Sequence, residues 1–215
     1  METLIKNTKE ELVEKFINAK EESKRKRKQL VKQKELLVNL TEQTLRKKLP
    51  NTEIKTDDNS VYVYTTNKYH QKDFRISFSD GNVNVSSPTL FEAPLIVYQT
   101  AIWETLLQHQ DEILNFQLDY MNSYEVDRIE DDCKWVLENY LADETFYKMV
   151  KGESITYNNQ TYQIEGKTKS GRYSFVITHN NTYRDNERTT KNYYKDDIIS
   201  KVRDYVRQLV NEIVL

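Results

Sequence analysis

The apolar residues of this chain alternate between the helical spacing of about 3.6 and the strand spacing of 2. Residues 8–49 contain neither Gly nor Pro, and Pro50 follows the run. Thr8 and Glu11 have the form of a capping box at its start. We therefore predict one long helix, about 63 Å in length if it is unbroken. A helix of this length exceeds a compact domain of this size, so we expect part of it to project or to pair. Its apolar residues gather at both ends, with no obvious cover for both within the chain, which favours a homodimer.

Two stretches, residues 53–87 and 153–179, alternate apolar and polar residues with the strand period. One face of the first stretch carries Phe74, Ile76 and Phe78. The Asp80-Gly81 pair that follows favours a tight hairpin turn. We predict two antiparallel meanders, each with one face on a core and the other in water.

The most apolar segment is residues 95–120, which we predict to be a central helix that the other elements pack against. Its apolar residues form two adjacent rows at helical spacing. The first row consists of Ile102, Leu106, Ile113, Phe116 and Tyr120. The second row consists of Trp103, Leu107, Leu114, Leu118 and Met121. A large apolar side chain gains about 1.5 to 3 kcal/mol on burial, so we expect both rows, Trp103 included, to lie in the core.

Two more helices follow, one over residues 124–150 and one from Asp196 to the C-terminus. The first shows apolar residues at alternating spacings of three and four, the pattern of a narrow packing seam. These seam residues are Val126, Ile129, Cys133, Val136 and Tyr140. We interpret Cys133 as a small buried hydrophobic residue without chemistry of its own, because neighbouring acids disfavour a thiolate.

The predicted fold class is α+β. It comprises a long N-terminal helix, two antiparallel β-meanders, a central apolar helix with an acidic helix beside it, and a C-terminal amphipathic helix. We place the long helix, residues 1–50, apart from an α+β globular domain, residues 51–215. The order helix, meander, helix occurs twice, which suggests a degenerate internal duplication.

Composition narrows the class of protein. No run approaches the 18 apolar residues of a membrane span, and the N-terminus has no apolar signal core. The single cysteine excludes an internal disulfide, so we predict a cytoplasmic protein without a membrane partner. The 15 Tyr beside only 4 Gly and 3 Pro resemble the codon bias of an AT-rich bacterial or phage genome.

The formal charge of −2 hides two opposed regions. The first fifty residues carry 14 basic and 8 acidic side chains, whereas residues 111–144 carry 11 acidic and 2 basic ones. We predict that partners contact the most highly charged part of each region. These candidate partner-binding residues are Lys24, Arg25, Lys26, Arg27 and Lys28 on the basic helix and Glu130, Asp131 and Asp132 on the acidic one. The basic helix could also lie on the acidic one, within the chain or across a dimer.

Candidate catalytic residues are few. His70, His109 and His179 lack metal-ligand spacing, and no glycine-rich phosphate loop is present, so we predict neither a metal nor a cofactor. We expect each histidine to lie in a loop or on a helix surface. Asp143 with Glu165 and Lys167 resembles the carboxylate and Glu-x-Lys pattern of metal-dependent nucleases, in which the acids hold a divalent cation and the lysine steadies the attacking water.

The segment Gly171-Arg-Tyr-Ser-Phe-Val-Ile-Thr178 resembles the aromatic RNA-binding strand of RRM domains. In such strands bases stack on aromatic rings flanked by cations. The order of helices and strands here differs from that fold, and alternating aromatic residues are also typical of an ordinary core strand.

We therefore predict a non-enzymatic protein–protein interaction module, a regulator or inhibitor of a host protein of the phage or mobile-element type, present as a homodimer. The alternative is a nucleic-acid-binding protein that uses the basic helix. A nuclease-like enzyme is the third candidate.

Overall fold

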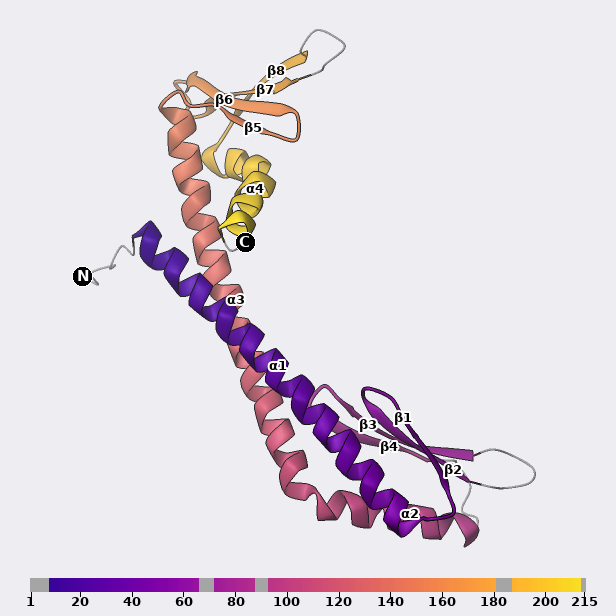
Figure 1. Ribbon diagram of the computed structural model, residues 1–215. Coiled ribbons are helices and arrows are strands. Elements are labelled where there is room, and N and C mark those ends of the chain that lie inside the picture. Colours follow the sequence, from indigo (N-terminus) through magenta and orange to yellow (C-terminus); the bar gives the residue numbers. More distant parts are fainter. Residues whose placement is uncertain (1–7, 66–71, 88–92, 181–186, 214–215) are drawn as a thin grey trace. The chain divides into compact units, whose positions relative to one another are not determined.

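The computed structural model describes residues 8–65, 72–87, 93–180 and 187–213, and confirms the α+β class (Figure 1). The helices and strands follow one another in a repeated order. The first half comprises α1 (Lys9–Lys48), β1 (Glu53–Thr56), β2 (Ser60–Thr65), β3 (Lys72–Ser79), β4 (Asn82–Ser86) and α2 (Ala93–Gln108). The second half comprises α3 (Gln110–Val150), β5 (Ile155–Tyr157), β6 (Gln160–Lys167), β7 (Tyr173–His179), β8 (Glu187–Tyr193) and α4 (Lys195–Glu212).

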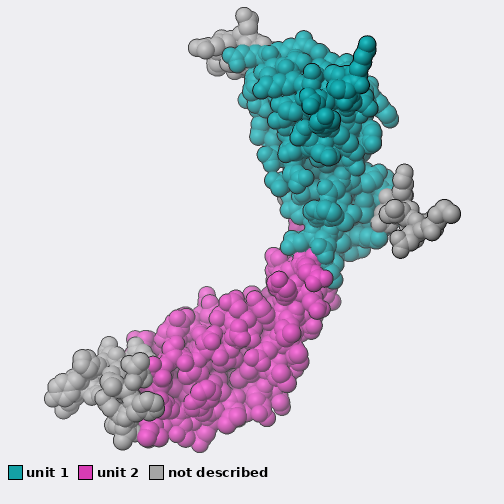
Figure 2. Space-filling model, turned by 180° about the vertical axis from the view of Figure 1, so that it is seen from behind, with its two compact units in different colours: residues 1–19, 129–215 teal, residues 20–128 magenta. Residues whose placement is uncertain are grey.

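The chain forms two compact units, coloured separately in Figure 2. Unit 1 consists of residues 1–19 and 129–215, and unit 2 of residues 20–128. Helices α1 and α3 therefore contribute residues to both units. The long N-terminal helix is confirmed, as is its capping box, in which the backbone N–H of Thr8 donates to Glu11 and that of Glu11 to the Thr8 hydroxyl.

Unit 2 contains the first meander, an antiparallel sheet with the order β1-β2-β3-β4. The predicted facing of β3 is confirmed, because Phe74, Ile76 and Phe78 are fully buried. The predicted Asp80-Gly81 turn is also confirmed, with positive φ at both residues. There Gly81 lies against the ring of Tyr120, and a Cβ at Gly81 would be 2.6 Å from Tyr120 Cδ1.

One face of this sheet is covered by α1 and α2 and by the start of α3, which together form a single core. The core residues of the sheet include Ile54, Val61, Val63, Phe74, Ile76 and Phe78. The core residues of the helices are Leu37, Val38, Leu45, Leu49, Leu95, Ala101, Ile102, Leu106 and Phe116. The C-terminal apolar end of α1 is thus covered within the chain.

The predicted central helix over residues 95–120 is wrong in its boundaries. The helix breaks at His109, whose backbone N–H is shared between the carbonyls of Thr105 and Leu106. Figure 1 shows the chain changing direction there, between α2 and α3. The segment after the break continues to Val150, so the predicted acidic helix and the second half of the central helix are one element, α3.

Burial of the two predicted apolar rows differs. In the first row Ile102, Leu106 and Phe116 are buried and Ile113 packs against the core. The second row is exposed throughout, so its predicted place in the core is wrong. The sheet and α1 cover only one side of α2 and of the start of α3. The first row lies on that side, and the second row lies beyond it.

Unit 1 contains the second meander, with the order β5-β6-β7-β8. Phe175 is fully buried, and Tyr173 and Ile177 pack against the same core, as predicted for β7. Helix α4 closes this unit through one apolar face, also as predicted. Its buried residues are Ile198, Val202, Val206 and Val210.

A second cluster in unit 1 joins three helices. Leu12 and Phe16 from the start of α1 pack with Leu137 and Leu141 of α3 and with Val206 and Val210 of α4. Both apolar ends of α1 therefore have cover within the chain, which removes the reason we gave for pairing with a second copy. The homodimer itself stays a prediction.

The predicted seam of the acidic helix is also wrong in part. Ile129, Val136 and Tyr140 are exposed, and the buried residues of this segment lie on the neighbouring face. Those residues include Leu137, Leu141, Thr145, Phe146 and Met149. Cys133 is partly buried beside the three-helix cluster, in agreement with a structural role.

The two meanders place core residues at matching positions. Val63 pairs with Phe74 in unit 2, and Ile164 pairs with Phe175 in unit 1. Each member of the second pair follows its counterpart by 101 residues. The same separation relates Ile54, Val61 and Ile76 to Ile155, Tyr162 and Ile177, and the buried Thr44 and Leu45 to the buried Thr145 and Phe146. A common origin of the halves stays a prediction, which this shared register supports.

Candidate protein-binding surface

Helix α2 of unit 2 presents an apolar stripe to solvent. Ile96, Trp103 and Leu107 follow one another at intervals of seven and four, so they share one face. Trp103 is 57% exposed and Leu107 is 65% exposed. Burial of either side chain by a partner would remove a large apolar area from water, which is the main favourable term in protein association.

The first turns of α3 carry a second stripe, formed by Leu114, Leu118 and Met121 at intervals of four and three. Met121 is 66% exposed, and both leucines are exposed as well. Between the two stripes lies a depression of about 390 Å³. It is lined by Trp103, Leu106, Leu107, Gln110, Asp111, Ile113, Leu114 and Gln117. We call the exposed residues Trp103, Leu107, Leu114, Leu118 and Met121 the α2–α3 patch.

The corner between α2 and α3 is held from beneath by polar contacts to α1. His109 is buried, contrary to the prediction that it lies on the surface, and its Nε2 is 2.9 Å from the Thr44 hydroxyl. Lys48 Nζ is 2.7 Å from the Glu104 carboxylate. The patch therefore lies on a corner whose inner side is packed and hydrogen-bonded, which keeps the two stripes in place.

The segment that carries the patch contains acidic but no basic residues. Residues 76–127 contain neither Lys nor Arg, whereas residues 93–127 contain six acids. Three of these acids are directed at α1. Asp127 accepts from Ser23 and Arg27, Asp119 accepts from Gln29 and Gln33, and Glu104 accepts from Lys48. Asp111 lines the depression, and Glu125, seven residues after Leu118, shares the face of the α3 stripe.

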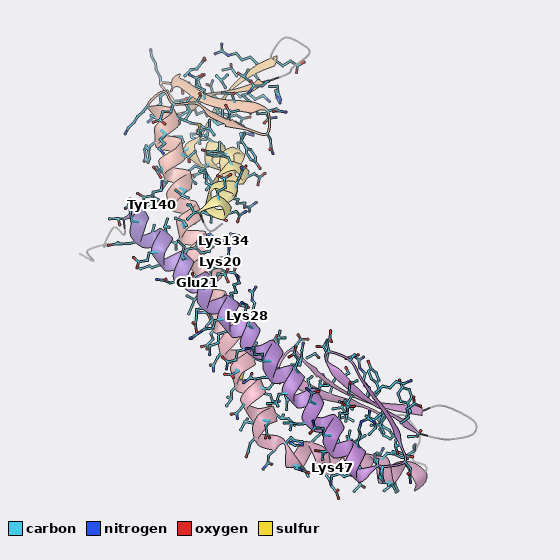
Figure 3. The ribbon with its side chains drawn as sticks, in the orientation of Figure 1. Lys20, Glu21, Lys28, Lys47, Lys134 and Tyr140 are labelled. Carbon is cyan, nitrogen blue, oxygen red and sulfur yellow. The ribbon has the colours of Figure 1, made fainter. Side chains whose placement is uncertain are left out.

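The predicted basic contact residues lie in the part of α1 that belongs to unit 2. Lys24, Arg25, Arg27 and Lys28 are exposed, and Lys26 is half-buried; Figure 3 labels Lys28 on this helix. The Arg27 guanidinium is 3.2 Å from the Asp127 carboxylate. The basic helix thus lies partly on the acidic helix within unit 2, one of the two arrangements left open by the sequence.

The predicted acidic contact residues belong to unit 1. Asp131 and Asp132 are exposed on α3, and Glu130 is half-buried. The acid that the structure brings to the basic stretch is Asp127, which the prediction did not single out. Asp127 and the predicted acids are only three to five residues apart on α3, and a shift of that size along a helix decides which side chain faces α1. The sequence alone does not give the position of α1 along α3.

The nuclease-like residues have separate neighbours. Asp143 lies 2.6 Å from Lys195, Glu165 pairs with Arg188 across the sheet, and Lys167 Nζ lies 5.2 Å from the ring centroid of Tyr173. In the described parts of the chain no three His, Cys, Asp or Glu side chains are grouped so that they could hold a metal ion.

The RRM-like strand is β7, and its central aromatic residue is not accessible. Phe175 is fully buried, with its ring stacked near that of Tyr162 at 6.0 Å. Tyr173 packs edge-on against Phe146 at 5.0 Å. Among the histidines, His179 is exposed, but it is the last residue of strand β7 rather than part of the predicted loop or helix surface. His70 lies outside the described residues.

Shifted pKa values occur in structural ion pairs of unit 1. A hydrogen bond to Asp143 raises the pKa of Lys195, and a hydrogen bond to Glu144 raises that of Lys148. Burial opposes ionisation of Glu144, but hydrogen bonds from Lys148 and Lys9 outweigh it and lower the pKa of this carboxyl. The pairs of Lys9 with Glu144 and of Lys195 with Asp143 join helices, and the pair of Glu144 with Lys148 lies within α3. All three belong to unit 1, whereas the patch belongs to unit 2.

Comparison with known proteins gives no match to any family model, curated protein or solved structure. Among the described residues, no helix combines the length and the apolar character that a membrane crossing requires. The interpretation of this chain therefore depends on its own surfaces.

Sequence reasoning identified the residues of the α2–α3 patch but placed them in the core. A signal that they face outward was present. The apolar residues of 95–120 occupy a wider arc than one sheet and one helix can cover, and the same stretch lacks basic residues. A large exposed apolar area is typical of an interaction site.

Proposed function

We propose that this chain is a non-enzymatic protein-binding module and that the α2–α3 patch of unit 2 is its main contact surface. The observation that carries the proposal is the exposure of five large apolar side chains on α2 and α3, of which Trp103, Leu107 and Leu114 line one depression, at a corner that a buried hydrogen bond joins to α1. Contiguous exposed apolar surface on a folded protein is typical of an interaction site. A role as a regulator or inhibitor of a host protein in the cytoplasm is the form of this function that the composition favours.

Selection of binding peptides tests this function without a known partner. A displayed library of random 20-residue peptides is selected on the full chain, and each binder is measured against two variants. Leu107→Ser with Leu118→Ser removes apolar surface from the patch. Leu36→Ser is the matched control, because Leu36 is an exposed apolar residue of α1 in the same unit.

We expect the selected peptides to lose binding to the double variant and to retain it with Leu36→Ser. Peptides that bind the native chain and the double variant equally well would contradict the proposal, since the contact would then lie elsewhere. Circular dichroism of both variants checks that the fold is intact.

The exposed cations of α1 favour nucleic-acid binding as the second candidate. Five phosphate contacts by residues 24–28 would give a slope near −4.5 for log affinity against log salt on duplex DNA, about 0.9 for each contact. Gln at all five positions keeps the helix propensity. We expect no tight binding at physiological salt, because Asp127 and Asp119 lie beside the same helix. Sub-micromolar affinity that the five Gln changes abolish would promote this candidate.

A further inference from the structure

We infer that the occupant of the α2–α3 patch is a basic amphipathic helix of a partner protein. This inference rests on the proposed function, since it names the chemistry of the partner for the same surface. Three properties of unit 2 point to it: the shape of the patch, the sign of its charge, and the poor fit of a second copy of this chain.

The shape of the patch favours a helix. Two apolar stripes, on α2 and on α3, flank a depression of about 390 Å³, near the lower limit of about 300 to 1,000 Å³ for ligand pockets. Such a depression accepts one or two anchoring side chains, and the stripes beside it can contact the apolar residues one turn before and after them. A helix laid into a groove presents such a series of anchors at intervals of three, four and seven.

The length of the surface sets the length of the partner. Asp111 and Glu125 are separated by 14 residues of one α-helix, which corresponds to about 21 Å. A partner helix that contacts both acids and the depression therefore needs about four turns.

The charge of the surface selects a basic partner. Asp111 lines the depression and Glu125 shares the face of the α3 stripe, while residues 76–127 supply no Lys or Arg. Lys48 of α1 neutralises one side through its contact with Glu104. Lys or Arg residues beside the apolar stripe of a partner helix would lie close to Asp111 at the depression and to Glu125 along α3. Opposite charges on the two surfaces speed association and set the orientation of the partner.

A second copy of this chain fits the patch poorly. A two-fold contact brings the same surface of both copies together, so it would place Asp111 and Glu125 near the same acids of the other copy. The basic part of α1 offers no better occupant, because residues 20–29 are almost wholly polar and would leave the depression unfilled.

Three synthetic peptides of 18 residues test the inference on the full chain. The first is an amphipathic helix of Leu, Ala and Lys, the second has Glu in place of each Lys, and the third is a scrambled sequence of the first. Binding is measured by isothermal titration. We expect micromolar 1:1 binding of the basic peptide and binding at least about tenfold weaker for the other two.

Variants of the chain locate the contact. Leu107→Ser with Leu118→Ser should weaken binding of the basic peptide by about tenfold or more, and Leu36→Ser should leave its affinity unchanged. Asp111→Lys with Glu125→Lys should weaken binding of the basic peptide and strengthen binding of the acidic one. This reversal is a result that loss of folding would not produce.

The outcomes separate this inference from the function it rests on. If the basic and acidic peptides bind equally well and both lose binding to the Leu107/Leu118 variant, the inference of a basic partner is overturned and the protein-binding function remains. Binding of no helical peptide would overturn the inference, and the library selection would still decide the function. A dimer in sedimentation that Leu107→Ser dissociates, or binding to vesicles with phosphatidylserine that requires Leu107, would assign the patch to a second copy or to a lipid surface instead.

Discussion

Helices α2 and α4 occupy the same place in the two halves of the chain, each following a four-stranded meander and covering its sheet. Each buries an inner face. Ile102 and Leu106 of α2 lie in the core of the first sheet, and Val206 and Val210 of α4, 104 residues later, lie in the three-helix cluster. This offset is three residues longer than the 101 that relates the two sheets. Their outer faces differ. Trp103 matches Arg207, and Val97 matches Lys201.

The outer face of α4 shows what the architecture alone requires. Arg207 lies 3.2 Å from Asp204 and 4.0 Å from Glu138, so this helix presents ordinary surface ion pairs to water. Helix α2 covers its sheet equally well with an apolar outer face. The fold tolerates charge at these positions in unit 1, so folding alone does not require the apolar outer face of α2 in unit 2. We propose binding of a partner as the reason for it.

The largest predicted effects concern the matched cores. Phe74→Ala and Phe175→Ala each remove a fully buried ring from the same position of the two meanders. Each should lower the free energy of unfolding by about 3 to 5 kcal/mol. Urea unfolding followed by circular dichroism measures the loss, and hydrogen exchange assigns it to a unit. A loss under about 1 kcal/mol at one of them would show that the two sites do not correspond.

The next effect distinguishes two glycines with positive φ. Gly81→Ala should cost about 2 to 4 kcal/mol, because an alanine at φ +69° is strained by about 1 to 2 kcal/mol and its Cβ overlaps the Tyr120 ring. Gly171→Ala, at φ +82° with no atom within 4 Å of the added Cβ, should cost the strain alone.

Thermal unfolding of both glycine variants checks the difference. Addition of Tyr120→Ala to Gly81→Ala gives the control, because the clash is then absent and the two changes should cost less together than the sum of their separate effects. Equal losses at Gly81 and Gly171 would mean that the contact with Tyr120 does not form.

A smaller effect depends on pH. Glu144 is 3.2 Å from Lys9 and 3.0 Å from Lys148, and its pKa is lowered in the folded chain. Its contribution to stability is therefore present above the pKa of the unfolded state, about 4.3, and is lost as the pH falls through the folded value. Glu144→Gln should cost about 0.5 to 1 kcal/mol at pH 7, since both pairs are partly solvated.

Unfolding curves of the native chain and Glu144→Gln at pH 7 and at pH 3 test this dependence. The difference between them should shrink at the lower pH. A difference that grows on acidification would contradict the lowered pKa.

The smallest effect is at the patch itself. Trp103→Ala should cost under about 1 kcal/mol, because the side chain is 57% exposed, whereas a core tryptophan would cost about 3 to 5 kcal/mol. Arg207→Ala, the matched change in α4, should cost as little. A core-sized loss for Trp103→Ala would restore the interpretation of this residue as buried and remove the patch.

The elements were predictable from the sequence because each has a local cause. The capping box at Thr8, the Asp80-Gly81 turn and the alternation around Phe74 depend on neighbouring residues, and the structure confirms all three. The break at His109 was not predictable in this way. Neither Gly nor Pro marks it, and the buried contact of His109 with Thr44, 65 residues earlier, stabilises it.

The candidate surface was predictable only in part. Helical spacing identifies the rows that contain Ile102 and Trp103, but it does not say which row the sheet covers, because the two rows are equally apolar. The pairing of Arg27 with Asp127 likewise required the relative placement of α1 and α3 within unit 2. Contacts between distant segments decide both features.

The fluorescence of Trp103 tests the central claim most directly. The chain has two tryptophans, and Trp135→Phe leaves Trp103, which lines the depression of the α2–α3 patch, as the only tryptophan that excitation at the red edge of the absorption band selects over tyrosine. Saturation with the basic amphipathic peptide, which carries no tryptophan, should shift this emission to shorter wavelength, because the exposed indole becomes buried in the contact. A peptide that binds to the same variant and leaves the emission unchanged would contradict the claim that this patch is the binding surface.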